Sequence, residues 1–92
     1  VEQWGNDRGI IQNGKPMGQA IKTLEESVEL VDAINKGSTL EAMDAIGDIL
    51  VTLIMQCAIQ KTSIEECLQQ AYQQIKHRKG YLTPEGIFVK ES

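Results

Sequence analysis

The stretch MDAIGDILVTLIMQCAI, from Met43 to Ile59, decides the fold because it is apolar on nearly every side of a helix. Its polar residues form one narrow stripe, which begins with Asp44 and Asp48. A helix that is apolar nearly all round is normally buried, yet burying an ionised carboxylate without a partner is costly. The stripe therefore indicates either a groove open to water or the wall of an internal site.

Glycine, proline and capping residues divide the rest of the chain. Pro16 suits the first position of a helix, and Ser38 with Glu41 forms a capping box that Ser63 and Glu66 repeat. We expect a loop or broken helix over residues 5–16. Three helices should follow, from Pro16 to about Lys36 with Gly37 as the stop, from Ser38 to about Gln60, and from Ser63 to the stop at Gly80. The chain then continues with a turn at Thr83–Gly86 and a short apolar tail, Ile87–Val89.

No alternation typical of strands is apparent, so the sequence predicts an all-α fold in a single domain over residues 1–92. Two short partner helices cannot cover the apolar helix over residues 38–60, so we expect self-association. The predicted architecture is a short bundle of three main helices completed by homo-oligomerisation, as a homodimer or tetramer.

Composition narrows the classes of function. The net charge of −4 and the pI near 4.9 argue against a nucleic-acid polymer as partner. Cys57 and Cys67 fall at apolar helical positions, which suits free thiols in a reducing cytoplasm. A single disulfide between them is the alternative that the sequence leaves open. The apolar run is judged too short and too interrupted by polar residues to span a membrane. The chain begins at Val1, so we expect a few N-terminal residues to be missing.

The preceding helix supplies further carboxylates. In TLEESVELVDAI, residues 23–34, Glu26 and Glu29 lie one turn apart on one face, next to Glu25. The opposite stripe is predicted to face the core and consists of Leu24, Val28 and Val31. A solvated face is the bland interpretation of these glutamates. Together with Asp44 and Asp48 on an adjacent antiparallel helix, they form a cluster that repels itself unless a cation fills it.

Carboxylate ligands select a hard ion, and we expect Mg²⁺, with Mn²⁺ as the other candidate. A di-iron bundle would need Glu-x-x-His pairs. The single histidine, His77, follows Gln74 at that spacing, so the di-iron interpretation fails.

The segments LEESVELVDAI and DAIGDILVTLI resemble the MazG-like family of all-α nucleoside triphosphate pyrophosphohydrolases. That family carries Glu-Glu-x-x-Glu on one helix and Glu-x-x-Asp on the next. Glu25, Glu26 and Glu29 match the first half, and Asp48 matches the end of the second. The sequence departs at Ala45, where the usual Glu would stand, and the acid lies one position earlier, at Asp44. Residues 2–10 and 78–91 also resemble phage-type members.

The resemblance implies Mg²⁺-dependent hydrolysis of a (deoxy)nucleoside triphosphate to the monophosphate and pyrophosphate. In that interpretation Glu26, Glu29, Asp48 and the substitute Asp44 hold the metal, and Glu25 is either a ligand or the base that orients the attacking water. Glu41 is assigned to its capping box and left outside the site.

The substrate needs cations besides the metal. The resemblance favours Arg78 and Lys79 as phosphate contacts, although this basic run also suits a helix C-terminus. Lys22 is a second candidate for the phosphates, and it could instead neutralise the neighbouring glutamates. Trp4 is a candidate for stacking on the base, whereas Tyr72 is predicted to lie in the core.

A second class of function stays open, namely a catalytically silent helical module for oligomerisation or regulation. In that case the acids are solvated or paired with the basic run over residues 76–79. A silent module would gain stability by losing Asp44 and Asp48, whereas an enzyme needs them.

Overall fold

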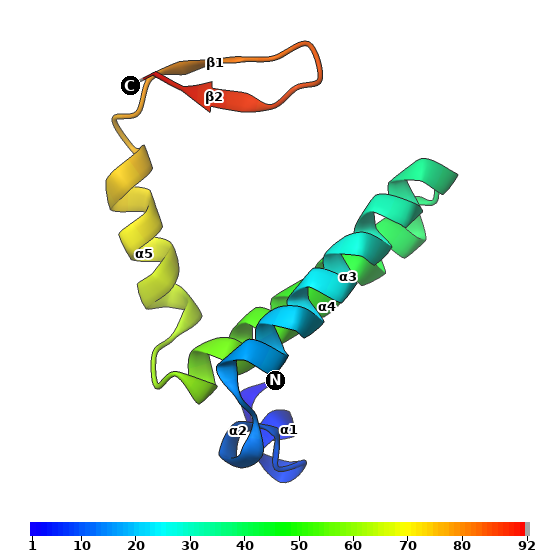
Figure 1. Cartoon of the computed structure of the whole chain (residues 1–92), viewed down its shortest axis with the longest axis vertical. Helices are drawn as coiled ribbons and strands as arrows, with labels where there is room; N and C mark the ends of the chain where they lie inside the picture. The colour runs from blue at the N-terminus through cyan, green and yellow to red at the C-terminus, as the bar shows by residue number, and fades with distance from the viewer. Residues whose placement is uncertain (92) are drawn as a thin grey trace.

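The computed structural model describes residues 1–91 and is mostly helical, as predicted (Figure 1). Its elements are α1 (Glu2–Asp7), α2 (Ile10–Asn13), α3 (Pro16–Lys36), α4 (Thr39–Ile59), α5 (Ile64–Ile75), β1 (Gly80–Leu82) and β2 (Phe88–Lys90). The long helices α3 and α4 lie side by side as an antiparallel hairpin, and α1 and α2 pack against α4 at one end of it. This helical hairpin is the body of the molecule.

The turn between the two long helices forms as the sequence predicts. Gly37 ends α3 in the left-handed conformation, at φ 71°, where a residue without Cβ is favoured. Ser38 then caps α4 by accepting a hydrogen bond from the Glu41 backbone N–H at 3.2 Å. The reciprocal half of the predicted capping box is replaced by an ion pair, since the Glu41 carboxylate lies 3.7 Å from Lys36 Nζ.

The contact between α3 and α4 is made of small and polar residues. Ala33 and Ala45 are only 3% and 4% exposed, which lets the two backbones approach closely. Further along, the hydroxyls of Thr23 and Thr52 are hydrogen-bonded at 2.8 Å, and Gln19 Nε2 donates to the Thr52 carbonyl at 3.2 Å. The polar stripe of α4 therefore faces α3 over much of its length.

The prediction that Leu24, Val28 and Val31 face the core is wrong for the single chain. Each is more than half exposed, because α3 turns its small and polar side toward α4. The same holds for α4, where Met43, Ile46 and Leu50 are exposed. The apolar faces of both helices point outward.

The prediction that the apolar run cannot span a membrane also needs correction. Within residues 1–91, α4 alone has the length and composition to cross a membrane, with 21 residues and a mean hydropathy of 1.7. The prediction that this run is too short and too interrupted is therefore wrong on both counts. The central helix of a helical bundle meets the same criterion.

The N-terminal segment is a broken helix, which is one of the two predicted alternatives. Its two short helices join at Gly9, which has φ 74°. Gly5 of α1 is buried against Met55 of α4, and a Cβ at Gly5 would collide with the Met55 sulfur. This close approach places α1 directly on the second half of α4.

The C-terminal segment departs most from expectation. Helix α5 ends at Ile75 instead of continuing to Gly80, and the expected apolar tail is the strand β2, paired antiparallel with β1. The predicted turn over residues 83–86 forms, with Gly86 at φ 84°. Strands of three residues are too short to show alternation in the sequence, which explains why the hairpin was missed.

This segment makes little contact with the rest of the chain. Helix α5 contacts α4 near the corner that joins them, and in residues 1–91 the β-hairpin packs against no helix. Figure 1 shows α5 leaving the end of α4 at a wide angle and carrying the hairpin away from α3 and α4. Tyr72, predicted to lie in the core, is therefore more than half exposed.

Candidate metal centre

Three carboxylates meet where the middle of α3 faces the middle of α4. One oxygen from each of Glu26, Glu29 and Asp48 lies within 4.8 Å of the others. The two glutamates project from successive turns of α3, and Asp48 reaches them from α4 because the helices are antiparallel neighbours. Within residues 1–91, no other group of acidic, cysteine or histidine side chains converges in this way.

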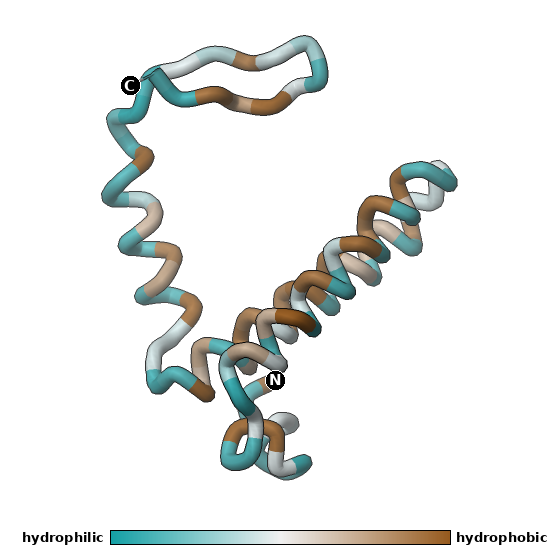
Figure 2. The backbone as a smooth tube through the Cα atoms, viewed as in Figure 1, coloured by the Kyte–Doolittle hydropathy of each residue, from teal (hydrophilic) through white to brown (hydrophobic). Residues whose placement is uncertain are grey.

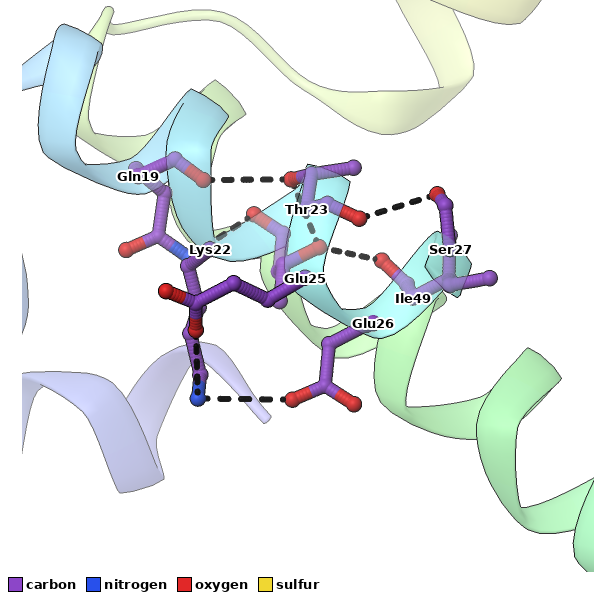
Figure 3. Close-up of polar contacts among 8 residues, drawn as sticks. Gln19, Lys22, Thr23, Glu25, Glu26, Ser27 and Ile49 are labelled. Carbon is purple, nitrogen blue, oxygen red and sulfur yellow. Dashed lines mark hydrogen bonds and ion pairs between the residues drawn. The ribbon is translucent and has the colours of Figure 1, made fainter. Parts of the chain in front are cut away.

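Glu26 is the buried member of this carboxylate cluster. It is 8% exposed, its Oε1 lies 3.4 Å from Lys22 Nζ, and its buried Oε2 has no hydrogen-bond partner among residues 1–91 (Figure 3). A buried carboxylate oxygen without a partner costs roughly 1–3 kcal/mol or more. A cation bound between the three carboxylates would supply the missing partner.

Repulsion among the carboxylates of the cluster also favours a bound cation. The hydrogen bond that Glu29 can donate to Glu26 only when Glu29 is protonated, followed by repulsion from the Glu26 charge, raises the pKa of Glu29, and burial and Asp48 add to the effect. Hydrogen bonds to Glu26 and Glu25 raise the pKa of Lys22 and keep it charged. One ammonium group therefore faces several carboxylates, so the site retains negative charge for a divalent ion. The oxygen ligands fit Mg²⁺ or Mn²⁺.

Glu25 lies outside the cluster. Its side chain is 60% exposed, and its carboxylate is 3.5 Å from Lys22 Nζ. Figure 3 shows the Lys22 ammonium between the carboxylates of Glu25 and Glu26. In the single chain Lys22 therefore neutralises glutamates, which was one of its two expected roles.

Asp44 also lies outside the three-carboxylate group. It borders an adjacent hollow of about 260 Å³ that Glu29 shares. The other lining residues are Asp32, Ala33, Lys36, Glu41 and Ala45. At the position of the usual glutamate, the methyl group of Ala45 is buried in the contact with α3. Asp44 therefore approaches the site from the side of Glu29.

Trp4 lies on the opposite side of the cluster. With Val1, Asp48 and Val51 it lines an open hollow of about 470 Å³. The Arg8 guanidinium stacks 4.4 Å from the centre of the indole ring, and Trp4 is 45% exposed. An exposed aromatic face thus adjoins a cluster carboxylate. A planar ring could stack on it.

Arg78 and Lys79 are not near the cluster in the single chain. They lie in the link between α5 and β1, which Figure 1 shows at the far end of α5, away from α3 and α4. Neither side chain forms an ion pair in residues 1–91. Their predicted role as phosphate contacts therefore needs a second chain or a movement of α5.

The sequence analysis missed the residues that support the cluster. The bonds among Gln19, Thr23 and Thr52 fix the spacing of α3 and α4 one turn from Glu26. The one available signal was the polar stripe of α4, which includes Thr52. Asp32, which borders the hollow beside Asp44, carried no distinguishing pattern.

The fold and these residues define a class: a helical protein whose central pair of helices carries carboxylates suited to a hard divalent ion. Comparison with known families then identifies it. The chain belongs to the MazG nucleotide pyrophosphohydrolase domain family, which matches residues 18–83 and so includes both helices of the cluster.

One relative comes from a bacteriophage. It is the uncharacterized 18.2 kDa protein in the rep-hol intergenic region of Haemophilus phage HP1 (strain HP1c1), which is 34% identical over 55 residues. The match covers 60% of this chain and 34% of the relative, so the chain spans about a third of that protein's length. No solved structure matches the chain significantly.

Proposed function

We propose that this protein hydrolyses a (deoxy)nucleoside triphosphate to the monophosphate and pyrophosphate in a Mg²⁺-dependent reaction. The observation that carries the proposal is the buried Glu26 oxygen without a partner, next to Glu29 and Asp48. Membership of the MazG family supports the reaction class. Nucleoside triphosphates are abundant in the cytoplasm, which is the location we propose.

Glu26, Glu29 and Asp48 would hold the metal, with Asp44 joining from the side of Glu29 either directly or through water. The bound ion supplies charge neutralisation at the phosphates and lowers the pKa of coordinated water. Aspartate is shorter than glutamate and Asp44 starts outside the cluster, so we propose contact through water as its more natural role. Mn²⁺ satisfies the same oxygen ligands.

Glu25 is proposed to orient the attacking water and accept its proton. The water oxygen forms a bond to the α-phosphorus, the bond from that phosphorus to the α–β bridging oxygen breaks, and pyrophosphate leaves with the bridging oxygen. Its large exposure and its place one residue before Glu26 favour this role over that of a ligand. Lys22 would contact the phosphates while retaining its bond to Glu26.

Trp4 is proposed to stack on the nucleobase, since its exposed ring borders the hollow that Asp48 shares. Arg78 and Lys79 are proposed as further phosphate contacts.

The outward apolar faces support a homodimer or tetramer. On α3 the exposed residues Met17, Ile21, Leu24, Val28 and Val31 follow alternating steps of four and three. That spacing is typical of a helix packed in a bundle of parallel or antiparallel helices.

The same exposed faces favour a second candidate, a silent oligomerisation module, in which Lys22 simply neutralises the acids. One assay separates the two. Pyrophosphate release is measured for the four ribo- and four deoxyribonucleoside triphosphates with Mg²⁺ and, separately, with Mn²⁺. The enzyme is expected to release pyrophosphate from at least one of them, and Glu29→Gln should abolish the release. Glu85→Gln, in the turn of the β-hairpin, is the matched control. Failure with every substrate and either metal would contradict the proposed activity.

A further inference from the structure

The corner between α4 and α5 brings the two cysteines of the chain together. Cys57 lies in the last turn of α4, Cys67 is the fourth residue of α5, and their sulfur atoms are 3.7 Å apart with both thiols free. Cys57 comes nine residues after Asp48 on α4, which is about 13 Å further along the helix axis. This thiol pair is therefore separate from the carboxylate cluster.

The two thiols differ in their access to solvent. Cys57 is 8% exposed, whereas Cys67 is exposed. Burial, followed by the hydrogen bond with Cys67, raises the pKa of Cys57 and keeps that thiol protonated. A small oxidant in solution therefore meets Cys67 first. An accessible cysteine beside a second thiol that can resolve its oxidised form is the usual arrangement of a redox-sensitive pair.

The geometry allows a bond between the two sulfur atoms. A disulfide bond is about 2.05 Å long, and the sulfur atoms are now 3.7 Å apart. The difference is smaller than the movement of a sulfur atom between two rotamers of a cysteine side chain. The bond can therefore form by rotation of the side chains while α4 and α5 stay in contact.

Helix α5 depends on this corner for its position. Within residues 1–91, α4 is the one helix that α5 contacts. Figure 2 shows hydrophobic positions along α5 that stand away from α3 and α4. The link over residues 60–63 is short, with Lys61 in the left-handed conformation at φ 60° and Ser63 capping α5. A covalent bond between Cys57 and Cys67 would tie the first turns of α5 to the last turn of α4.

We propose that Cys57 and Cys67 form a reversible oxidation site for peroxides, and that oxidation fixes α5 on α4. The site does not rest on the proposed hydrolysis of nucleotides. In the cytoplasm a disulfide of this kind is transient, so it reports an oxidant instead of serving as permanent structure.

The reaction takes two steps. The Cys67 thiolate attacks one oxygen of hydrogen peroxide, the O–O bond breaks, and the hydroxide that leaves takes up the proton released by the Cys67 thiol. The sulfur of Cys57 then attacks the sulfur of the Cys67 sulfenic acid, the S–O bond breaks, and the hydroxide that leaves takes the Cys57 proton. Two thiols and one peroxide thus give one disulfide and two waters, and the sulfurs lose the two electrons that the peroxide gains. Two equivalents of a small thiol reduce the disulfide again.

Peroxide titration of the reduced, full-length protein tests the site. The chain is treated with one molar equivalent of hydrogen peroxide, free thiols are blocked with N-ethylmaleimide, and unreduced peptides are identified by mass spectrometry. Both thiols should be lost together, in a disulfide that joins Cys57 to Cys67 within one chain, and dithiothreitol should restore both. Sulfinic acid on Cys67 with a free thiol on Cys57, or disulfides that join two chains, would overturn the proposal.

A matched pair of variants tests the order of the two steps. In Cys57→Ala, dimedone should trap Cys67 as the sulfenic acid, and excess peroxide should carry Cys67 on to the sulfinic acid. In Cys67→Ala, the buried Cys57 should stay unmodified in the folded protein. Circular dichroism checks that both variants fold. Sulfinic acid forming on Cys67 as fast in the wild-type chain as in Cys57→Ala would show that Cys57 does not resolve it.

Hydrogen exchange measures the effect of the bond on α5 and needs no variant. The backbone amides of α5 should exchange several-fold more slowly in the oxidised chain than in the reduced chain, because opening of the corner is restrained. The amides of α3 are the internal control and should exchange at the same rate in both. Equal exchange of α5 in the two states would overturn the proposal that oxidation fixes this helix.

Discussion

At the scale of single residues, the proposed chemistry depends on Glu26. Its side chain is buried at the contact of α3 and α4, yet one of its oxygens has no partner in residues 1–91. A fold tolerates such a cost when a ligand removes it. Glu29 and Asp48 add charge where charge is already unfavourable. The metal-free protein is therefore less stable than the helical pair alone would make it.

Metal should raise the stability of this protein by mass action. At a metal concentration 100 times Kd, the gain is about 2.7 kcal/mol. We expect the melting temperature to rise with Mg²⁺ or Mn²⁺, and Glu29→Ala or Asp48→Ala to remove most of the rise. Either variant should equal or exceed the parent in chelator, since repulsion is relieved. A thermal melt with and without metal measures this, with Glu85→Ala as control. An equal response in all variants would show that the cluster is not a metal site.

The raised pKa of Glu29 predicts how the metal-free protein responds to pH. A carboxyl group whose pKa is higher in the folded state than its ordinary value of 4.5 binds its proton more tightly when folded. Its contribution to stability is complete below the ordinary value and is lost as pH rises through the folded value. Melting in chelator should therefore show stability falling over that range. Glu29→Gln should flatten this part of the profile, and an unchanged slope would contradict the origin of the shift.

Ala45 stands where the family usually has a glutamate, and Asp44 is the proposed fourth metal ligand in its place. Mutating Asp44 tests this assignment. Asp44→Asn should lower turnover at least tenfold, equivalent to about 1.4 kcal/mol of lost transition-state stabilisation. Asp44→Glu should recover part of the rate. Glu41→Gln should leave the rate nearly unchanged, because Glu41 pairs with Lys36. Full activity in Asp44→Asn, with loss in Glu41→Gln, would move the role to Glu41.

At the scale of elements, the sequence predicts α3 and α4 well because their ends depend on local rules. Pro16, Gly37 and Ser38 act through backbone geometry and capping within a few residues, so their roles could be inferred without a structure. The face of α3 that packs against α4 could not be inferred in this way. The pattern offers an apolar stripe and a polar one, and α4 packs on the polar side, where Thr23 and Thr52 bond.

The residues of the candidate site likewise fall into those whose position the sequence predicts and those whose position it does not. Glu26, Glu29 and Asp48 were identified from their spacing on helices predicted to be neighbours, and they do converge. Asp44 lies on the adjacent flank, where it borders the hollow that Glu29 shares, and the buried Ala45 has only a methyl group to place between the helices. The position of Arg78 and Lys79 depends on the angle of α5, which no local pattern encodes.

The corner between α4 and α5 holds both cysteines, with their sulfur atoms 3.7 Å apart and no disulfide. Burial, followed by the hydrogen bond with Cys67, raises the pKa of Cys57 and keeps it protonated. The thiolate is the reactive form. Iodoacetamide should therefore modify the exposed Cys67 first in the native protein and both residues after unfolding. Peptide mass spectrometry distinguishes the two, and preferential labelling of Cys57 would contradict the described corner.

At the scale of the whole molecule, a single chain leaves large apolar faces exposed to water. The outward faces of α3, α4 and α5 are all apolar, and a small core of Ala33, Ala45, Met55 and Cys57 is buried. A small chain with such faces buries a limited core by itself. We therefore expect the protein to work as a homo-oligomer.

Sedimentation should show a homodimer or a dimer of dimers at micromolar concentration. Leu24→Asp together with Val28→Asp, on the outward face of α3, should dissociate it and lower the melting temperature, because the interface would then have to bury unpaired charges. Thr39→Asp, on α4 at its exposed N-terminus, is the control. A compact, well-folded monomer of the wild-type chain would contradict this expectation.

The contact between Gly5 and Met55 has a consequence for selectivity. Trp4 immediately precedes Gly5, so the distance from the indole ring to Asp48 depends on how closely the α1 backbone rests on one thioether. A methyl group added at Gly5 would meet the flexible end of the Met55 side chain, so either that side chain or the α1 backbone must shift. If Trp4 stacks on the nucleobase as proposed, a shift of α1 would change the preference among substrates without replacing any residue that lines the hollow.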